Sequence, residues 1–226
     1  MTPDYGVAVS RWRDAAGQAW TDYTRHAFVA GLGDGTMPET CFLHYLRQDW
    51  IFLKHFSRAW ALAAVKADTI AEIRAATATL NALINEEMRL HVEICAAAGI
   101  SQADLEATTE APENMAYTRF VLEAGFSGDF LNLLAALAPC VHGYGDIGLH
   151  LKSTRTSDRY AEWIDTYAGD DYQAVCVEAG QLIDTALANR LGPDWPSLPC
   201  ASALADTFAS ATRLEVGFWD MGLRAP

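Results

Sequence analysis

The sequence has few basic residues. Its 226 residues include 16 Lys and Arg against 29 Asp and Glu, which gives a formal net charge of −13. The lysines are scarce, and the arginines are scattered rather than gathered into a patch. A protein that binds duplex nucleic acid needs a basic surface that displaces counterions. Binding to an anionic membrane surface also needs clustered basic residues. The composition therefore argues against nucleic acid and against a membrane surface as direct partners.

Long apolar runs and paired cysteines are absent as well. No run approaches the ~18 residues that span a bilayer, although 51% of the residues are hydrophobic, which is ample for a core. The five cysteines are odd in number and show no paired spacing, which argues against a disulfide scaffold and indicates a reducing compartment. The first residues, from Met1 to Tyr5, lack the basic and apolar regions of a signal peptide. We expect a cytoplasmic protein.

Signals for β-structure are missing too. The chain has no alternating strand runs, no Asn-Gly hairpin signal and no internal repeat. Apolar residues recur at helical spacing, which predicts an all-α fold, a single-domain helical bundle over residues 1–226. Predicted caps are the Thr36 and Glu39 capping box, Ser101, and Ser157-Asp158. The predicted helices cover residues 5–31, 37–66, 68–98, 113–125, 128–152, 158–168, 170–190 and 200–222.

The stretch from Leu133 to Tyr144 combines an apolar helix with reactive groups. Pro139 lies inside the helical pattern, where a proline removes a backbone donor and predicts a kink. The next residue is Cys140, and Tyr144 follows one turn later on the same helix face. A thiol and a phenol on an inward face can line a pocket, but free cysteine is also among the most buried residue types. On these residues alone, core packing is favoured over a functional role.

Two acids interrupt apolar helix faces elsewhere in the chain. Asp49 stands among aromatic and aliphatic residues of one predicted helix, and Glu215 does so in the last one. Burial of an unpaired carboxylate is costly, so Asp49 is either a structural carboxylate that meets tyrosines or an arginine, or a ligand-binding group. The inward faces also carry three tyrosines, Tyr117, Tyr144 and Tyr167. Together with Cys140, these side chains indicate a polar pocket inside the bundle.

Glu87 and His91 lie one helical turn apart, which suggests a metal site as one interpretation. Di-iron helical bundles use Glu and His at i, i+3 on two helices, together with further carboxylates. Here the spacing is i, i+4 and the sequence contains no second copy. We therefore interpret Glu87 and His91 as a local hydrogen-bonded pair, and we predict no metal and no cofactor.

A pocket with two buried carboxylates and aromatic walls suits a flat, weakly basic heterocycle. A carboxylate beside a ring nitrogen can donate or share a proton, which makes the ring electron-poor. A thiolate such as that of Cys140 can then add to the ring as a nucleophile. The sequence signals no Ser-His-Asp arrangement, no Gly-rich phosphate loop and no zinc-spaced cysteine pair. His142 follows Cys140 by two residues, so on a helix it points elsewhere.

A set of segments along the chain resembles the TenA / thiaminase II family. The opening segments are His26-Ala27-Phe28-Val29, Gly33-Asp34-Gly35 and Phe42-Leu43-His44-Tyr45-Leu46-Arg47-Gln48-Asp49, with Ala27 where the family usually has proline. Further matches follow in family order, at Glu86-Glu87 and His91, Pro139-Cys140 with Tyr144 and Gly148, Trp163-Ile164 and Tyr167, and Arg213-Leu214-Glu215 with Phe218-Trp219. Each match is weak alone, but the set is highly specific.

The resemblance implies an all-helical fold similar to haem oxygenase, without haem, that typically assembles as a homotetramer. It also implies hydrolysis at the methylene carbon of an aminopyrimidine. Members release hydroxymethylpyrimidine from aminomethylpyrimidine, a breakdown product of thiamin, and can cleave thiamin itself. The partner would then be a small-molecule pyrimidine. The family divides into a cysteine class and a glutamate class, and Cys140 at the matching place implies the cysteine class.

The family resemblance also implies residue roles. Cys140 would be the nucleophile that adds to the ring, Glu215 would protonate a ring nitrogen, and Asp49 would bind the amino-pyrimidine edge. The implied substrate-binding residues are Tyr144, Tyr167, Tyr117 and Phe52. Family members often have tyrosine where Phe52 stands, and a phenyl ring can stack on the substrate but offers no hydroxyl group.

Two alternatives stay open. One is a regulator, because family members have been labelled activators of extracellular enzyme production. The other is a pyrimidine-binding or metal-dependent protein of the same fold with altered or lost catalysis, in which Glu87, His91 or Asp49 would be metal ligands. The remaining cysteines are interpreted as packing or peripheral residues. They are Cys41, Cys95, Cys176 and Cys200.

Overall fold

A computed structural model describes residues 3–225, and within them every regular element is a helix and no strand occurs. The predicted all-α fold class is confirmed. The contacts divide the chain into two compact units, each built from two separate stretches. Unit 1 comprises residues 1–37 and 134–216, and unit 2 comprises residues 38–133 and 217–226. The assignment of a single domain to residues 1–226 stays a prediction.

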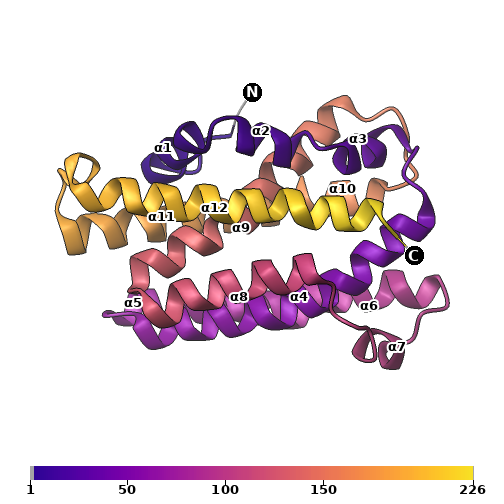
Figure 1. Ribbon diagram of the computed structural model, residues 1–226, viewed down its shortest axis with the longest axis horizontal. Coiled ribbons are helices and arrows are strands. Elements are labelled where there is room, and N and C mark those ends of the chain that lie inside the picture. The colour runs from indigo at the N-terminus through magenta and orange to yellow at the C-terminus, as the bar shows by residue number, and fades with distance from the viewer. Residues whose placement is uncertain (1–2, 226) are drawn as a thin grey trace. The chain divides into compact units, whose positions relative to one another are not determined.

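Figure 1 labels the helices of both units. Unit 1 contains α1 (Val7–Ala16), α2 (Gln18–Thr24), α3 (Ala27–Asp34), α10 (Ala161–Tyr167), α11 (Asp170–Leu191), a 3₁₀ turn (Trp195–Ser197) and most of α9 (Phe130–Thr154) and α12 (Pro199–Leu223). Unit 2 contains α4 (Glu39–Lys66), α5 (Ile70–Ala82), a π-helical turn (Leu83–Glu87), α6 (Met88–Ala97), α7 (Gln102–Glu106) and α8 (Pro112–Ser127). The helices predicted over 37–66, 113–125, 128–152, 170–190 and 200–222 are confirmed with small shifts of their ends.

The prediction of one continuous helix over residues 5–31 is wrong, because the structure has three helices there. Gly17 separates α1 from α2 with a φ of 54°, a left-handed conformation that glycine adopts at little cost. A second break precedes α3, where the His26 side chain accepts a hydrogen bond from the backbone N–H of Phe28. Helix α3 then passes through Gly31, the predicted end, to Asp34. The apolar spacing identified helices correctly but did not reveal these breaks.

The predicted capping box of Thr36 and Glu39 is wrong. The backbone N–H and the hydroxyl of Thr36 instead donate to the Asp34 carboxylate, at 2.9 and 2.6 Å. Helix α4 begins at Glu39, after Pro38, without a side-chain cap. The N-cap position is thus Pro38, and Thr36 lies two residues before it, too early to cap the helix.

The other two predicted caps have opposite outcomes. Ser101 caps α7 as predicted, in a capping box with Asp104. Helix α10 begins only at Ala161, so the predicted start at residue 158 is wrong. The Ser157 hydroxyl accepts a hydrogen bond of 3.2 Å from the backbone N–H of Arg159, which makes a local turn before the helix.

Helix α4 is the element around which unit 2 is built. It packs against α5, α6, α7 and α8, and Figure 1 shows it alongside α8. Its buried positions include Tyr45, Asp49, Phe52 and Phe56, which follow the helical repeat along one face. The side chain of Asp49 thus lies on the apolar face, as predicted, and the residue is 3% exposed.

Unit 1 contains a close approach that only glycine permits. A Cβ atom at Gly180 of α11 would lie 1.7 Å from the backbone oxygen of Tyr5. We expect Gly180→Ala to lower the free energy of unfolding by about 2–3 kcal/mol, because the backbone of residue 5 must move to make room. Urea denaturation measures this change.

The chain offers a matched control for this substitution in α12. A Cβ at Gly217 meets nothing within 4 Å, so Gly217→Ala is expected to stabilise the helix by about 0.5–1 kcal/mol. Equal stabilities of the two variants would contradict the packing described for Gly180.

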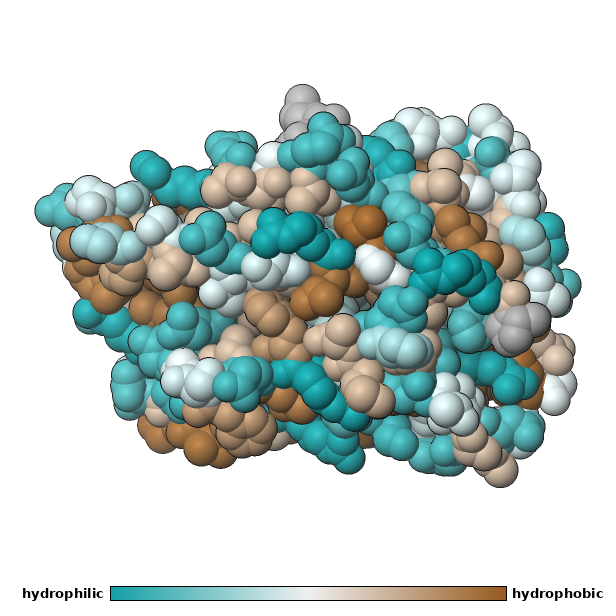
Figure 2. Space-filling view, viewed as in Figure 1, coloured by the Kyte–Doolittle hydropathy of each residue, from teal (hydrophilic) through white to brown (hydrophobic). Residues whose placement is uncertain are grey.

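The surface is mostly a mixture of polar and apolar side chains, as Figure 2 shows for one face. The most exposed large apolar residues are Val65, Phe126 and Ile70, with exposed fractions of 79, 69 and 62%. All three belong to unit 2, where α4 and α8 end and α5 begins. Within residues 3–225, no helix is long and apolar enough to cross a membrane.

Candidate functional site

The predicted site residues lie in two clusters, one in each unit. Unit 2 holds Asp49, Phe52 and Tyr117. Unit 1 holds Cys140, Tyr144, Tyr167 and Glu215.

In unit 2, Asp49 joins α4 to α6 through a buried ion pair. Its Oδ2 atom lies 2.6 Å from Nε2 of His91 and accepts a longer hydrogen bond, of 3.3 Å, from the Tyr45 hydroxyl. The side chains of His91 and Asp49 are only 2% and 4% exposed. Asp49 therefore meets a tyrosine, as the structural interpretation predicts, and it also meets an imidazole that the sequence did not assign to it.

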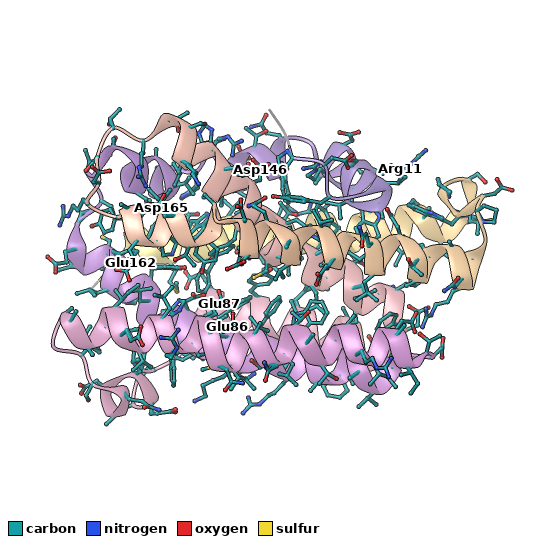
Figure 3. The ribbon with its side chains drawn as sticks, turned by 180° about the vertical axis from the view of Figure 1, so that it is seen from behind. Arg11, Glu86, Glu87, Asp146, Glu162 and Asp165 are labelled. Carbon is teal, nitrogen blue, oxygen red and sulfur yellow. The ribbon has the colours of Figure 1, made fainter. Side chains whose placement is uncertain are left out.

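His91 has an acceptor at each ring nitrogen. Nδ1 lies 2.9 Å from the backbone oxygen of Glu87, which belongs to the π-helical turn, and Figure 3 labels Glu87 beside Glu86. Burial favours the neutral ring, but the hydrogen bond and charge of Asp49 and the charge of Glu87 outweigh it and raise the pKa of His91 to about 9. The ring is therefore an imidazolium at neutral pH.

Glu87 and His91 form a local hydrogen-bonded pair, as predicted. The contact joins the His91 ring to the backbone oxygen of Glu87. In the described part of the chain, no group of three or more His, Cys, Asp or Glu residues has the arrangement to hold a metal ion. The geometry around His91 is thus that of an ion pair.

Phe52 is the centre of an aromatic group in unit 2. Its ring centroid lies 4.9 Å from that of Tyr117, 5.2 Å from that of Phe56 and 5.6 Å from that of Phe218. Phe52 and Tyr117 are 4% and 0% exposed. Phe52 follows Asp49 by one turn, so unit 2 places a flat apolar wall next to a carboxylate.

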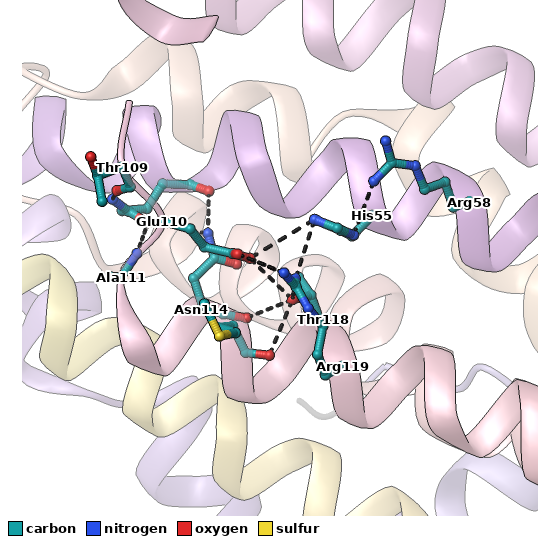
Figure 4. A network of polar contacts seen from close by, with 10 residues as sticks. His55, Arg58, Thr109, Glu110, Ala111, Asn114, Thr118 and Arg119 are labelled. Atoms are coloured by element: carbon teal, nitrogen blue, oxygen red, sulfur yellow. Dashed lines mark hydrogen bonds and ion pairs between the residues drawn. The ribbon is translucent and has the colours of Figure 1, made fainter. Parts of the chain in front are cut away.

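A polar network fixes the start of α8, and so Tyr117, against α4 (Figure 4). Glu110 accepts two hydrogen bonds of 2.8 Å from the guanidinium of Arg119, which also lies 3.2 Å from Nε2 of His55. Gln48 holds the preceding loop through the backbone of Thr109, at 2.9 Å. Gln48 is the direct neighbour of Asp49, so the same turn of α4 carries the acid and positions the helix that bears Tyr117.

In unit 1, Cys140 is a half-buried cysteine on α9, which continues through Pro139 without interruption. The backbone oxygens on both sides of Cys140 accept hydrogen bonds from side chains. The Tyr23 hydroxyl lies 3.5 Å from the oxygen of Pro139, and the Tyr172 hydroxyl lies 3.2 Å from that of Val141. These contacts tie the thiol-bearing turn to α2 and α11. A kink at Pro139 stays a prediction.

The rings around Tyr144 form an aromatic cluster in unit 1. The centroid of Tyr144 lies 4.8 Å from that of Tyr167, and Trp163 lies 4.6 Å from Tyr167. Tyr172 meets the edge of Tyr167 at 4.9 Å. Tyr144 stands one turn after Cys140, so the structure brings Tyr144 and Tyr167 together next to the helix turn that carries the thiol.

Glu215 is the second acid predicted to face inward, and the structure buries it on α12 with an exposed fraction of 1%. Another buried carboxylate, Asp146, lies on α9 in the same unit, as Figure 3 shows. Asp146 is an anchor: it accepts hydrogen bonds from Arg25 at 2.9 Å and from the indole N–H of Trp20 at 3.1 Å. Its partners hold the N-terminal helices against α9.

His142, which the sequence analysis did not pair with Cys140, lies between two backbone carbonyl groups. Its Nδ1 is 2.8 Å from the oxygen of Ala138 and its Nε2 is 3.1 Å from that of Cys176. Burial nevertheless lowers the pKa of His142 to about 4. The folded protein therefore keeps this ring neutral at pH values where an exposed histidine is charged.

This histidine predicts an acid-dependent loss of stability. Between about pH 6.5 and pH 4, the unfolded chain takes up a proton at residue 142 that the folded chain does not, so the free energy of unfolding falls as the pH falls. Urea denaturation at pH 7 and pH 4.5 measures the loss. We expect a smaller loss for His142→Gln, whose amide does not titrate; an equal loss in both proteins would contradict the prediction.

Sequence reasoning predicted a tyrosine partner for Asp49 without naming Tyr45, and it missed both Tyr172 and the contact of His91 with Asp49. Tyr45 could have been found, because it precedes Asp49 by one helical turn. The contact of His91 with Asp49 joins residues far apart in the chain and depends on a π-helical turn, for which the sequence carries no simple signal.

An all-α chain with these buried acids, aromatic walls and a half-buried thiol fits the family that the sequence resembles. The chain belongs to the TENA/THI-4/PQQC family, whose model matches residues 13–225. The predicted family resemblance is confirmed.

Three relatives show how far the similarity extends. An uncharacterized protein of Haemophilus influenzae is 37% identical over 207 residues, which cover 90% of this chain and 93% of that protein. An aminopyrimidine aminohydrolase of Halalkalibacterium halodurans is 32% identical over 205 residues, which cover 89% of each chain. A crystal structure described as a TenA family transcription regulator, from Silicibacter sp. TM1040, is 60% identical, with a TM-score of 0.97 and coverage of 99% of this chain and 100% of that chain.

Proposed function

We propose that this protein is an aminopyrimidine hydrolase of thiamin salvage or degradation. It converts aminomethylpyrimidine and water to hydroxymethylpyrimidine and ammonia. The observation that carries the proposal is the burial of Asp49, in an ion pair next to the aromatic wall of Phe52 and Tyr117. A carboxylate beside a flat apolar wall suits a heterocycle with an amino group. The activity named for the Halalkalibacterium halodurans relative supports the assignment.

Cys140 is the proposed nucleophile of a cysteine-class mechanism. Its thiolate adds to the pyrimidine ring while Glu215 donates a proton to a ring nitrogen, so the ring electrons do not accumulate on carbon. The electron pair of the ring then expels ammonia from the exocyclic methylene, and the leaving amine takes up a proton. Water adds to the methylene and loses a proton. Departure of the thiolate and loss of the ring proton restore the aromatic pyrimidine.

The remaining predicted residues have binding roles in this proposal. Asp49 accepts a hydrogen bond from the amino group of the pyrimidine, and Phe52 and Tyr117 pack against its ring. Tyr144 and Tyr167 hold the thiol, the reacting carbon or water. Cleavage of thiamin to its pyrimidine and thiazole parts follows the same steps with a different leaving group.

The test is a substrate panel with the purified native protein. Aminomethylpyrimidine, formylaminopyrimidine and thiamin are incubated side by side, and the pyrimidine products are separated by chromatography. We expect hydroxymethylpyrimidine to appear fastest from aminomethylpyrimidine. Turnover of none of the three would overturn the proposed function.

A regulatory role is the second candidate, because the relative from Silicibacter is described as a transcription regulator. The net charge of −13 opposes direct contact with duplex DNA. A gel shift at low salt separates the two functions, and we expect no shifted band. Tight binding to duplex DNA would favour the regulator.

We also propose that the chain assembles as a homotetramer in the cytoplasm, in line with the family resemblance. Light scattering of the eluting protein measures the mass of the assembly directly. A monomeric mass would refute the proposed assembly.

A further inference from the structure

Stability alone does not account for the ion pair of His91 and Asp49. The two side chains are almost fully buried, and desolvation of two charges costs free energy that a packed apolar pair would not. Each ring nitrogen of His91 faces an atom that can only accept, a carboxylate oxygen and a backbone carbonyl oxygen. Donation to both needs the protonated ring. His142 also faces two acceptors, but both are neutral carbonyl oxygens, whereas one acceptor of His91 is a carboxylate at 2.6 Å, whose charge favours the protonated ring.

A π-helical turn places His91 on the buried face of its helix, opposite Asp49. In unit 2, Ala76 and Leu83 are buried two turns apart, and an uninterrupted α-helix would continue this buried face at Leu90. The buried residues are instead His91 and Cys95, so the buried register has moved by one residue. A π turn, with its i→i+5 hydrogen bonds, adds one residue to one helical turn, and such turns are frequent at functional sites. The turn at Leu83–Glu87 accounts for the shift.

The ion pair leaves a defined part of Asp49 for a ligand. Among residues 3–225, both hydrogen bonds that Asp49 accepts end on its Oδ2 atom, from His91 and from Tyr45. The Oδ1 atom is therefore the one that a ligand can meet. The other oxygen of this carboxylate already accepts from His91 and Tyr45, so Oδ1 is placed to accept a hydrogen bond from a ligand.

We propose that His91, brought inward by the π-helical turn, is a positioning residue that holds Asp49 as an acceptor-only carboxylate, so that the site selects pyrimidines with an amino group over those with an oxo group. An amino group donates to Oδ1, whereas an oxo oxygen placed there faces a second acceptor without a proton between them. This inference rests on the proposed function, and it names the atom of the protein that recognises the substrate class.

The test compares two ligands by isothermal titration at pH 7.5: hydroxymethylpyrimidine, which carries the 4-amino group, and its 4-oxo counterpart. We expect the native protein to bind the amino compound roughly tenfold more tightly or better. In His91→Gln, the amide can still donate to Asp49 but carries no charge, so the preference should fall towards one. His44→Gln, which changes a half-buried histidine on the same helix as Asp49, should keep the native preference.

Deletion of Ile84 tests the π turn itself. Ile84 is 49% exposed, and its deletion removes the extra residue of the π turn, so the helix regains α-helical spacing with His91 still on the buried face. We expect this variant to keep the native amino preference. A preference that falls as in His91→Gln, in a variant with native helix content, would contradict the register shift assigned to the π turn.

A measurement on the native protein keeps the inference testable even if the variants fail to fold. The ¹⁵N resonances of the His91 ring at pH 7.5 should show both nitrogens protonated; a neutral ring would overturn the inference. A native preference that persists in His91→Gln would overturn the inference alone. Native protein that binds neither pyrimidine would overturn the proposed function and the inference with it.

Discussion

Replacement of Cys140 by alanine is expected to abolish ammonia release from aminomethylpyrimidine, with kcat reduced by roughly 10³-fold or more. Alanine has no group that can add to the ring. Without that addition, the protonated ring has no electron pair that can expel the amine from the methylene carbon. The binding residues Asp49, Phe52 and Tyr117 are unchanged, so the affinity for hydroxymethylpyrimidine should stay close to the native value.

The chain supplies a matched control in Cys200, a free cysteine that is exposed on α12. Cys200→Ala should turn over at the native rate, and circular dichroism should show the native helix content for both variants. If Cys140→Ala released ammonia at the native rate, the assignment of the nucleophile would be wrong.

Glu215→Gln is expected to have the second largest effect, a loss of about 10²–10³-fold in kcat with a much smaller change in KM. Glutamine keeps the shape of the side chain and can still hydrogen-bond to the ring, but it has no proton to transfer. The effect should therefore fall on the chemical step. Steady-state kinetics with aminomethylpyrimidine separate the two constants.

Glu178→Gln is the control for this substitution, because Glu178 is an exposed glutamate of α11 in the same unit. It should leave both constants unchanged. A Glu215→Gln variant that raised KM and kept the native kcat would assign Glu215 to ground-state binding and remove it from the proton transfer.

The fold class could be predicted from apolar periodicity, because long amphipathic helices such as α4 carry the signal along their whole length. The breaks within residues 5–31 could not, because they depend on the conformation of Gly17 and on a histidine cap at His26. Glycine is compatible with both a helix and a break, and only the packing around it decides which occurs. The Thr36 cap was wrong because helix α4 begins at Glu39, with Pro38 at the N-cap, two residues after Thr36.

The site residues that could be predicted are those that stand out from the apolar pattern of their own helix. Asp49 and Glu215 were found because each is a charged residue on an apolar face, and the structure buries both. The partners of Asp49 were harder to predict. Tyr45 lies one turn away, but the contact with His91 depends on a π turn that shifts the buried face by one residue. The periodicity of one segment does not reveal that shift.

The measurement that tests the central claim most directly is the release of ammonia and hydroxymethylpyrimidine by the native protein, with aminomethylpyrimidine as the sole substrate. A coupled assay follows ammonia, and chromatography of the same samples follows the pyrimidine. We predict that both products appear in equal amounts at every time point, with many turnovers per chain. The absence of both products, in a sample whose circular dichroism shows the native helices, would contradict aminopyrimidine hydrolysis by this protein.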